Sequence, residues 1–189
     1  MMEEIIKKAR EWALKEIKKT GYPSLFNFET SIKQGQRLSK LYKANKDIVM
    51  LGTILMDIKL GECLLSGKLS EHTKRGVEET KNFLKKFKIE KEEFKIIINC
   101  VEAHHKKVQY KSIEAEICDN ADCYRFLNPK NVVLSLSDNI KEFGLDGALK
   151  HVEQKMDEKY KILSLDICKK ELEQCYRQFK DLIDKARGI

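Results

Sequence analysis

The stretch SIEAEICDNADCYRFLNP, Ser112 to Pro129, has the residue spacing of one amphipathic helix. Its inward positions recur every three or four residues, as one face of an α-helix requires: Ala115, Cys118, Asp122 and Phe126. A serine at the start is a preferred N-cap, and the Asn-Pro pair at the end disfavours a further turn. The stretch therefore predicts a helix from Ser112 to Phe126 that directs one carboxylate, that of Asp122, at the core.

Similar periodicity covers most of the remaining chain. It predicts helices at residues 3–19, about 29–44, 48–58, 70–87 and 91–106, a short one after Pro129, and others at about 146–160 and 165–186. Asp47 is the expected N-cap of the buried helix at 48–58, and Gly61 and Gly67 are expected to flank a loop. Only 9 Gly and 2 Pro occur in 189 residues, which disfavours a turn-rich β architecture. The sequence predicts an all-α fold in which residues 1–189 form a single domain.

The charge pattern limits the kinds of binding partner that we expect, and the cysteine content indicates the cellular compartment. The formal net charge is +7, but 37 Lys and Arg are interleaved with 30 Asp and Glu along nearly every segment, as on a solvated surface. This mixture, without an aromatic-rich basic cluster, argues against nucleic acid as the partner. Apolar runs fall far short of the ~20 residues that cross a bilayer, so no membrane partner is expected. The cysteines show no C-x-x-C spacing and follow no signal peptide, which predicts reduced thiols and a cytoplasmic protein. The sequence leaves open whether the chain forms a homo-oligomer.

Several of the predicted helices direct a metal-competent side chain inward. These groups are Asp57, His72, His104 or its neighbour His105, and Asp122. An unpaired polar group in a core costs about 2 to 7 kcal/mol, and one divalent cation would partner several of them at once. Taken singly, each residue has another interpretation. His72 would be a half-exposed helix residue, and either aspartate would be a helix cap or an ion-pair partner. Only one of the paired histidines is sure to face inward, since adjacent helix residues point about 100° apart. Their joint occurrence favours a metal site.

Four stretches in this order resemble segments of the HD-domain superfamily of metal-dependent phosphohydrolases. They are LGTILMDIKLGE (51–62), EHTKRGVEE (71–79), INCVEAHH (98–105) and IEAEICDNADCYRFL (113–127), which are similar to the family's ALLHDIG, H-x-x-x-G, I-x-x-HH and EA-x-x-x-x-x-AD segments. The resemblance covers about Glu29 to Leu127. It implies an all-α HD-like helical bundle with the C-terminal helices, residues 130–187, packed on it.

The chain departs from this family at two positions. Met56 stands where the family has the His of its His-Asp pair, and Ser31, or else Thr30, stands where the first His belongs. A thioether is a soft ligand that suits Mg, Mn or ferrous iron poorly. By the resemblance, the two missing His residues and the final Asp would hold one metal, while the retained Asp57, His72 and His104 or His105 would hold another. The expected cofactor is one divalent ion, Fe, Mn, Zn or Ni.

The resemblance also implies an activity. A metal-dependent phosphohydrolase acting on a small phosphorylated compound, such as a nucleotide, is the leading hypothesis, with Asp57, Asp122, Glu62 and Glu102 as candidate catalytic carboxylates. Asp122 would orient the attacking water or serve as a fourth ligand, and the two glutamates are candidates for a general base or a partner to a His. Four cations are candidates for phosphate binding, or else ordinary surface charges: Lys59, Lys74, Arg75 and Arg125. The alternative is a non-catalytic HD-like module that binds a ligand or a protein and keeps a degenerate or structural metal site.

Overall fold

The chain consists of helices throughout its described part. The structure, a computed structural model, describes residues 1–105 and 108–188, and every regular element in those ranges is helical. This confirms the predicted all-α fold. The chain divides into two compact units, Met1–Ala121 and Asp122–Ile189, with the boundary inside α7 (Ile113–Leu127). The packing of residues 130–187 on the rest of a single domain stays a prediction.

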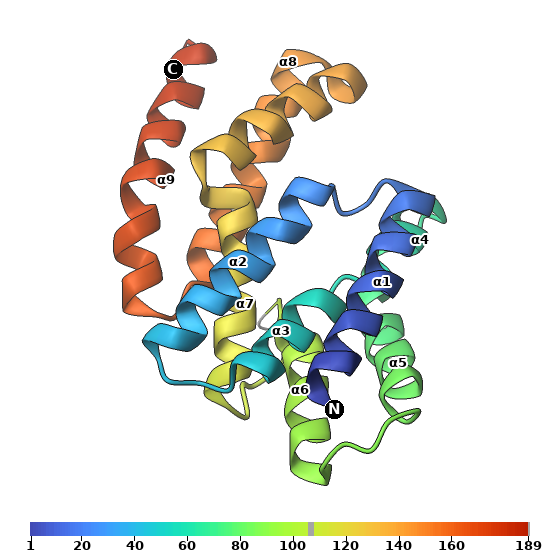
Figure 1. Cartoon of the computed structure of the whole chain (residues 1–189). Coiled ribbons are helices and arrows are strands. Elements are labelled where there is room, and N and C mark those ends of the chain that lie inside the picture. The colour runs from blue at the N-terminus through green and yellow to red at the C-terminus, as the bar shows by residue number, and fades with distance from the viewer. Residues whose placement is uncertain (106–107, 189) are drawn as a thin grey trace. The chain divides into compact units, whose positions relative to one another are not determined.

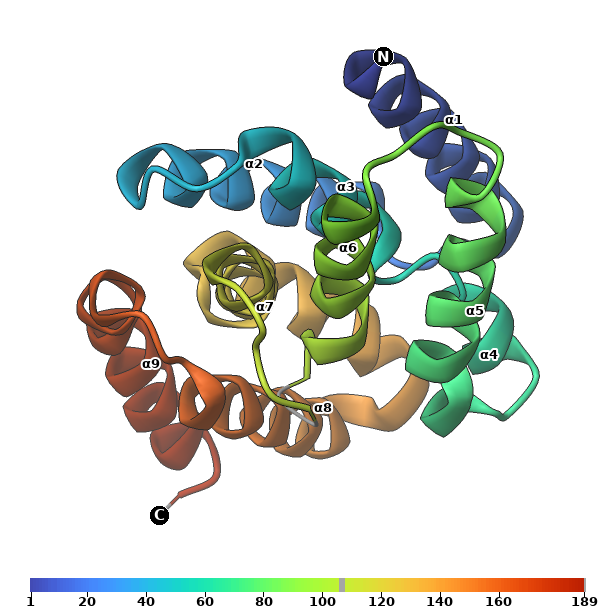
Figure 2. The same cartoon turned by 90° about the horizontal axis from the view of Figure 1, so that it is seen from below.

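The first unit is built around α3. It contains α1 (Met2–Thr20), α2 (Leu25–Leu41), α3 (Lys46–Leu55), α4 (Leu60–Leu65), the 3-10 turn η1 (Leu69–Glu71), α5 (His72–Leu84), α6 (Lys91–Ala103) and the first part of α7 (Figure 1). Helix α3 packs against α1, α2 and α6, while α5 packs against α4 and α6. Figure 2 shows α3 between α1 and α2, with α6 beside it.

Helix α3 is central because its sequence is apolar on nearly every side. Its residues from Ile48 to Leu55 are buried except Met50, as the sequence predicted for a buried helix. Its N-cap is Asn45 rather than the expected Asp47, since the Asn45 amide oxygen accepts hydrogen bonds from the backbone N–H groups of Asp47 and Ile48. Gly52 permits the closest approach: a Cβ at this position would lie 2.6 Å from Cys100 Cβ and 2.6 Å from Cys118 Sγ.

Two further expectations about local structure are corrected. Gly61 does not flank a loop but lies inside α4, where a Cβ would lie 2.1 Å from the Thr20 hydroxyl oxygen at the end of α1. This glycine therefore serves close helix packing and not a turn. Helices α3 and α6 also end earlier than expected, so Asp57 lies in the turn between α3 and α4, and His104 and His105 follow the last helical residue, Ala103.

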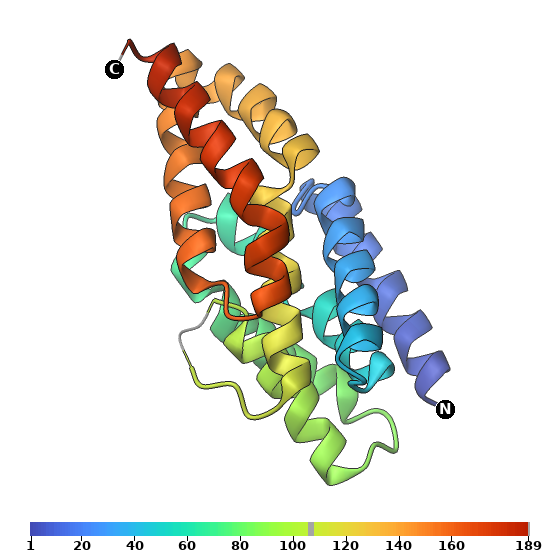
Figure 3. The same cartoon turned by 90° about the vertical axis from the view of Figure 1, so that its left-hand side faces the viewer.

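The second unit contains the end of α7, α8 (Pro129–Ile162) and α9 (Asp166–Ala186). Gly144, with φ 68° and ψ 179°, divides α8 into two helical arms, which match the two helices predicted there. Figure 3 shows α9 alongside α8. The two run antiparallel, with Tyr160 stacked on Tyr176 at 4.0 Å between ring centroids and Glu153 paired with both Lys180 and Arg187.

The cysteines and the helix lengths complete the description. All six cysteines are buried and none forms a disulfide within the described residues, and Cys118 and Cys123 are fully buried core residues, as expected. Burial raises the pKa of the Cys118 thiol, and a hydrogen bond with Cys100 raises it further. None of the described helices has a stretch both long and apolar enough to cross a bilayer.

The contact at Gly52 predicts that adding one methyl group there separates α3 from α6 and α7. We expect Gly52→Ala to lower the free energy of unfolding by about 1 to 3 kcal/mol, the usual cost of overpacking a core. The control is Gly76→Ala on α5, where an added Cβ meets its nearest neighbour at an ordinary 3.7 Å. That variant should be neutral or more stable, since alanine favours helix by up to about 1 kcal/mol. Urea unfolding of both variants measures the difference, and equal stabilities would contradict the close approach.

Candidate metal centre

His72 is held in one orientation by its own chain. It is the first residue of α5 and is 8% exposed, and its Nδ1 lies 2.7 Å from the carbonyl oxygen of Leu69 in η1. A carbonyl only accepts hydrogen bonds, so Nδ1 must carry the proton. In the neutral imidazole the lone pair is then on Nε2. Such a fixed tautomer is the usual arrangement of a metal-binding histidine.

His104 has the same arrangement in a deeper position. It is fully buried at the C-terminal cap of α6, and its Nδ1 donates to the carbonyl oxygen of Val101 at 2.6 Å. Its Nε2 is buried and accepts no hydrogen bond from any described residue. An unsatisfied buried acceptor costs about 1 to 3 kcal/mol. This nitrogen therefore needs a partner, and a cation would supply one.

The four retained candidates in the first unit converge on this nitrogen. The carboxylate of Asp57, 9% exposed, has its Oδ1 3.6 Å from His104 Nε2. His72 Nε2 lies 3.0 Å from His105 Nε2, and the three histidines each offer one ligand nitrogen, all within 4.8 Å of one another. Asp57, His72, His104 and His105 thus come together, whereas the sequence alone assured only one histidine of the pair.

This donor set fits a divalent transition metal. Ligand atoms about 2.1 Å from one ion, at a tetrahedral angle, lie about 3.4 Å from each other. The Asp57–His104 separation of 3.6 Å is close to that value and long for a hydrogen bond. Imidazole with carboxylate suits Zn, Fe, Mn or Ni. The residues present therefore fit one ion of the class expected from the sequence.

Neighbouring residues fix the elements that carry the ligands. Gly76, one turn after His72, lies beside both the turn after α3 and α6, because a Cβ there would lie at ordinary contact distances, 3.7 Å from the Met56 carbonyl oxygen and 3.9 Å from a Val101 methyl. The side chain of Asn99 on α6 donates to the carbonyl of Gln109 and accepts from the N–H of Lys111. It thereby anchors the chain beyond the histidine pair.

Buried packing residues occupy the two positions that depart from the family pattern. Met56 is 2% exposed, and Ser31 is 1% exposed with its hydroxyl donating to the Asn27 carbonyl at 3.3 Å. Neither side chain supplies a nitrogen or carboxylate ligand. The reduced ligand set, with one ion, stays a prediction.

Asp122 and Arg125 belong to the second unit, where they form a buried charge cluster. Asp122 is 1% exposed, and its two oxygens accept from Arg125 at 2.7 Å and from the ammonium of Lys159 at 2.6 Å. Lys159 on α8 is itself 1% exposed. In this arrangement two cationic side chains contact the carboxylate, and the guanidinium of Arg125 is engaged with a protein group. Sequence reasoning missed Lys159, although it continues the apolar stripe of Val152 and Met156.

The other predicted residues lie on the surface of the first unit. Glu62 pairs with Lys59 at 2.8 Å and with Arg75 at 3.6 Å. Burial alone would lower the pKa of Lys59, but the hydrogen bond and charge of Glu62 outweigh it and raise the value. The same contact lowers the pKa of Glu62, which makes this carboxylate a weaker general base. Lys74 is exposed, and Glu102 is half-buried on α6, two residues before His104.

Comparison with known proteins gives no match by sequence: no protein-family model and no curated protein matches the chain. Solved structures do match. A predicted HD superfamily hydrolase from an uncultured Thermotogales bacterium superposes with a TM-score of 0.70 at 12% identity, over 96% of this chain and 91% of that one. An HD-superfamily hydrolase from Bacillus thuringiensis superposes with a TM-score of 0.70 at 17% identity, over 99% of this chain and 97% of that one. The chain has the fold of the HD-superfamily hydrolases. YpgQ from Bacillus subtilis is similar as well, with a TM-score of 0.71 and 18% identity over 99% of this chain and 96% of that one. The HD-like fold expected from the four sequence stretches is confirmed.

The buried cluster in the second unit predicts a large effect of removing its lysine. Lys159→Met should destabilise the protein by about 1 to 3 kcal/mol, because it removes a charge-assisted hydrogen bond from the buried carboxylate of Asp122, which keeps Arg125 as a partner. The matched control is Lys155→Met on the same helix, whose partner Glu158 is solvent-exposed; its cost should stay below about 1 kcal/mol.

A double-mutant cycle with Asp122→Asn measures the coupling. The double variant should lose clearly less stability than the sum of the two single variants. If Lys159→Met unfolds at the same urea concentration as the parent, the ammonium is not the counter-charge of Asp122.

Proposed function

We propose that the chain is a metal-dependent phosphohydrolase that uses one divalent ion held by Asp57, His72, His104 and His105. The observation that carries this proposal is the buried Nε2 of His104, which lacks a hydrogen-bond partner in the described residues and faces Asp57 at 3.6 Å. The fold of HD-superfamily hydrolases supports the reaction class by analogy.

The ligand set accounts for the chemistry in simple terms. A bound divalent ion lowers the pKa of its water toward about 7 and polarises a phosphoryl oxygen. The Nδ1 hydrogen bonds of His72 and His104 keep both rings aimed before the ion binds, so little reorganisation is needed. The carboxylate of Asp57 supplies negative charge that offsets part of the charge of the ion.

Phosphate binding is assigned to cations near the ligands in the sequence. Lys59 follows Asp57 by two residues and Arg75 follows His72 by three, and both pair with Glu62. A phosphate group would compete with this carboxylate for the two cations, and an Arg fork matches phosphate geometry. A small phosphorylated molecule such as a nucleotide is the proposed substrate, and a cytoplasmic location, expected from the cysteine pattern, is part of the same proposal.

A second candidate function is a non-catalytic module that keeps one structural ion and binds a ligand or a protein. Two observations favour it. Met56 and Ser31 are buried packing residues where the resemblance places histidines, and Asp122 is balanced by Lys159 and Arg125. These features remove ligands of a second ion, and they leave the cluster around His104 intact.

Metal content and turnover distinguish the two functions. Untagged protein purified without chelators should carry about one ion per chain and release phosphate from at least one member of a nucleotide panel. His104→Ala and His72→Ala should each lower metal affinity by more than about 100-fold, since even partners of a ligand contribute about 10- to 100-fold. Elemental analysis and phosphate release are the measurements.

The control is His151→Ala, which removes the remaining histidine of the chain, in α8 of the second unit. It should leave metal content and turnover unchanged. Bound metal without turnover would favour the binding module, and protein that takes up no ion even after Mn or Ni is added would contradict the proposed function.

A further inference from the structure

One segment of the first unit departs from the mixed charge of the chain. From Thr30 to Lys46 the sequence contains no Asp or Glu, yet it carries these five basic residues: Lys33, Arg37, Lys40, Lys43 and Lys46. All five are exposed. Residues 80–89 also carry four lysines and no acidic residue, but the segment from Thr30 to Lys46 is longer and carries five basic residues, so it is a local concentration of positive charge.

The five cations line one hollow. It has a volume of about 560 Å3 and lies where α2 ends and α3 begins, and the amide of Gln36 also faces it. The residues of the structure that line it include no acidic group. The four lysines form no ion pair with any residue that the structure describes. Like charges held this close repel one another, and an anion would remove that repulsion.

The backbone fixes this arrangement. Lys33, Arg37 and Lys40 lie at i, i+4 and i+7 on one face of α2. The chain then turns at Lys43, which is the one non-glycine residue with positive φ, 53°, in the described ranges. The N–H of Ala44 donates to the Ser39 carbonyl at 2.9 Å, and the N–H of Asn45 donates to Glu114 on α7 at 3.0 Å. The turn is therefore tied down, and it brings Lys46 to the same hollow as the α2 face.

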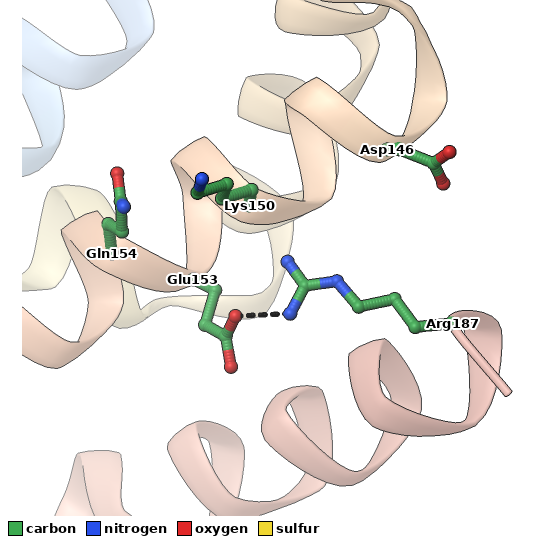
Figure 4. A pocket seen from close by; sticks show the side chains of 5 residues that line it. All are labelled: Asp146, Lys150, Glu153, Gln154 and Arg187. Carbon is green, nitrogen blue, oxygen red and sulfur yellow. Dashed lines mark hydrogen bonds and ion pairs between the residues drawn. The ribbon is translucent and has the colours of Figure 1, made fainter. Parts of the chain in front are cut away.

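A second hollow, in the other unit, provides a contrast. It has a volume of about 480 Å3 and is lined by Asp146, Lys150, Glu153, Gln154 and Arg187 (Figure 4). There the guanidinium of Arg187 pairs with Glu153 at 2.5 Å, so the charges largely neutralise each other. Size alone does not make an anion site. Of these two hollows, the basic one contains four lysines that form no ion pair with a described residue.

We propose that the basic hollow binds an oligophosphate, meaning three or more linked phosphate groups, either free or as the tail of a nucleotide. Such a ligand carries several negative charges in a volume that the hollow can hold, and the ammonium groups of the four lysines supply positive charge for its phosphate oxygens. No aromatic side chain lines the hollow, so it offers no platform for the base stacking on which single-stranded nucleic acid binding depends.

This site is separate from the metal cluster. Lys46 is the first residue of α3, and Asp57 lies two residues beyond its end, so about 15 Å of helix separates them. The proposal does not depend on hydrolysis, because the hollow shares no residue with the metal ligands.

Calorimetric titration of metal-depleted protein tests the proposal. Tripolyphosphate should bind at least about tenfold more tightly than AMP or inorganic phosphate, and its affinity should fall steeply with salt. If ATP matches tripolyphosphate, the nucleotide tail is a sufficient ligand; if only tripolyphosphate binds, the free oligophosphate is the ligand. Both results support the site.

Two triple variants with the same net charge locate it. K33Q/R37Q/K40Q should weaken tripolyphosphate binding by about tenfold or more, whereas K7Q/K15Q/K18Q, on exposed lysines of α1, should change it less than about twofold. Circular dichroism and metal uptake should be normal in both. The proposal would be overturned if both variants weakened binding equally or if tripolyphosphate did not bind. It would also be overturned if a single-stranded oligonucleotide bound more tightly than tripolyphosphate and K33Q/R37Q/K40Q abolished that binding.

Discussion

The structure of the candidate site depends on two imidazole rings whose Nδ1 atoms each donate a hydrogen bond to a backbone carbonyl. His72 donates to Leu69, His104 donates to Val101, and each ring then presents its Nε2 to the same small buried region. Burying these nitrogens beside the carboxylate of Asp57 costs free energy. For His104 Nε2, no hydrogen bond in the described part of the chain offsets this cost. A shared cation removes that cost, which is why the arrangement indicates metal binding rather than a polar core contact.

Helix α3 links this region to the rest of the first unit. Gly52 sets how near α3 comes to α6 and α7, and Gly76 lies where α5 packs beside the turn that carries Asp57. The candidate ligands lie at a helix start, as His72 does, or just beyond a helix end, as Asp57, His104 and His105 do, so helix packing determines their separation directly. The opposite end of α3 begins at the basic hollow, so the same helix separates the proposed metal site from the proposed oligophosphate site.

Periodicity in the sequence was sufficient to predict the helices and the residues that face inward, because burial imposes the 3.6-residue repeat directly. It did not predict where α3 and α6 end, since helix ends depend on local hydrogen bonds that a repeat does not record. For that reason the expectation that only one of His104 and His105 faces inward, which assumed helical geometry, did not hold. Both residues lie beyond the helix and both join the cluster. Lys159 was missed because a lysine is normally solvated, and the partner that permits its burial, Asp122, is 37 residues away. The basic hollow was missed because net charge was judged over the whole chain.

The most direct test of the central claim is to locate the ion. Crystals of the untagged protein grown with Mn or Ni, measured at the absorption edge of that metal, give an anomalous difference map. The account predicts one strong peak within about 2.3 Å of the Nε2 atoms of His72 and His104 and of an Asp57 oxygen. A map without a peak there, with Asp57 hydrogen-bonded directly to His104, would contradict it.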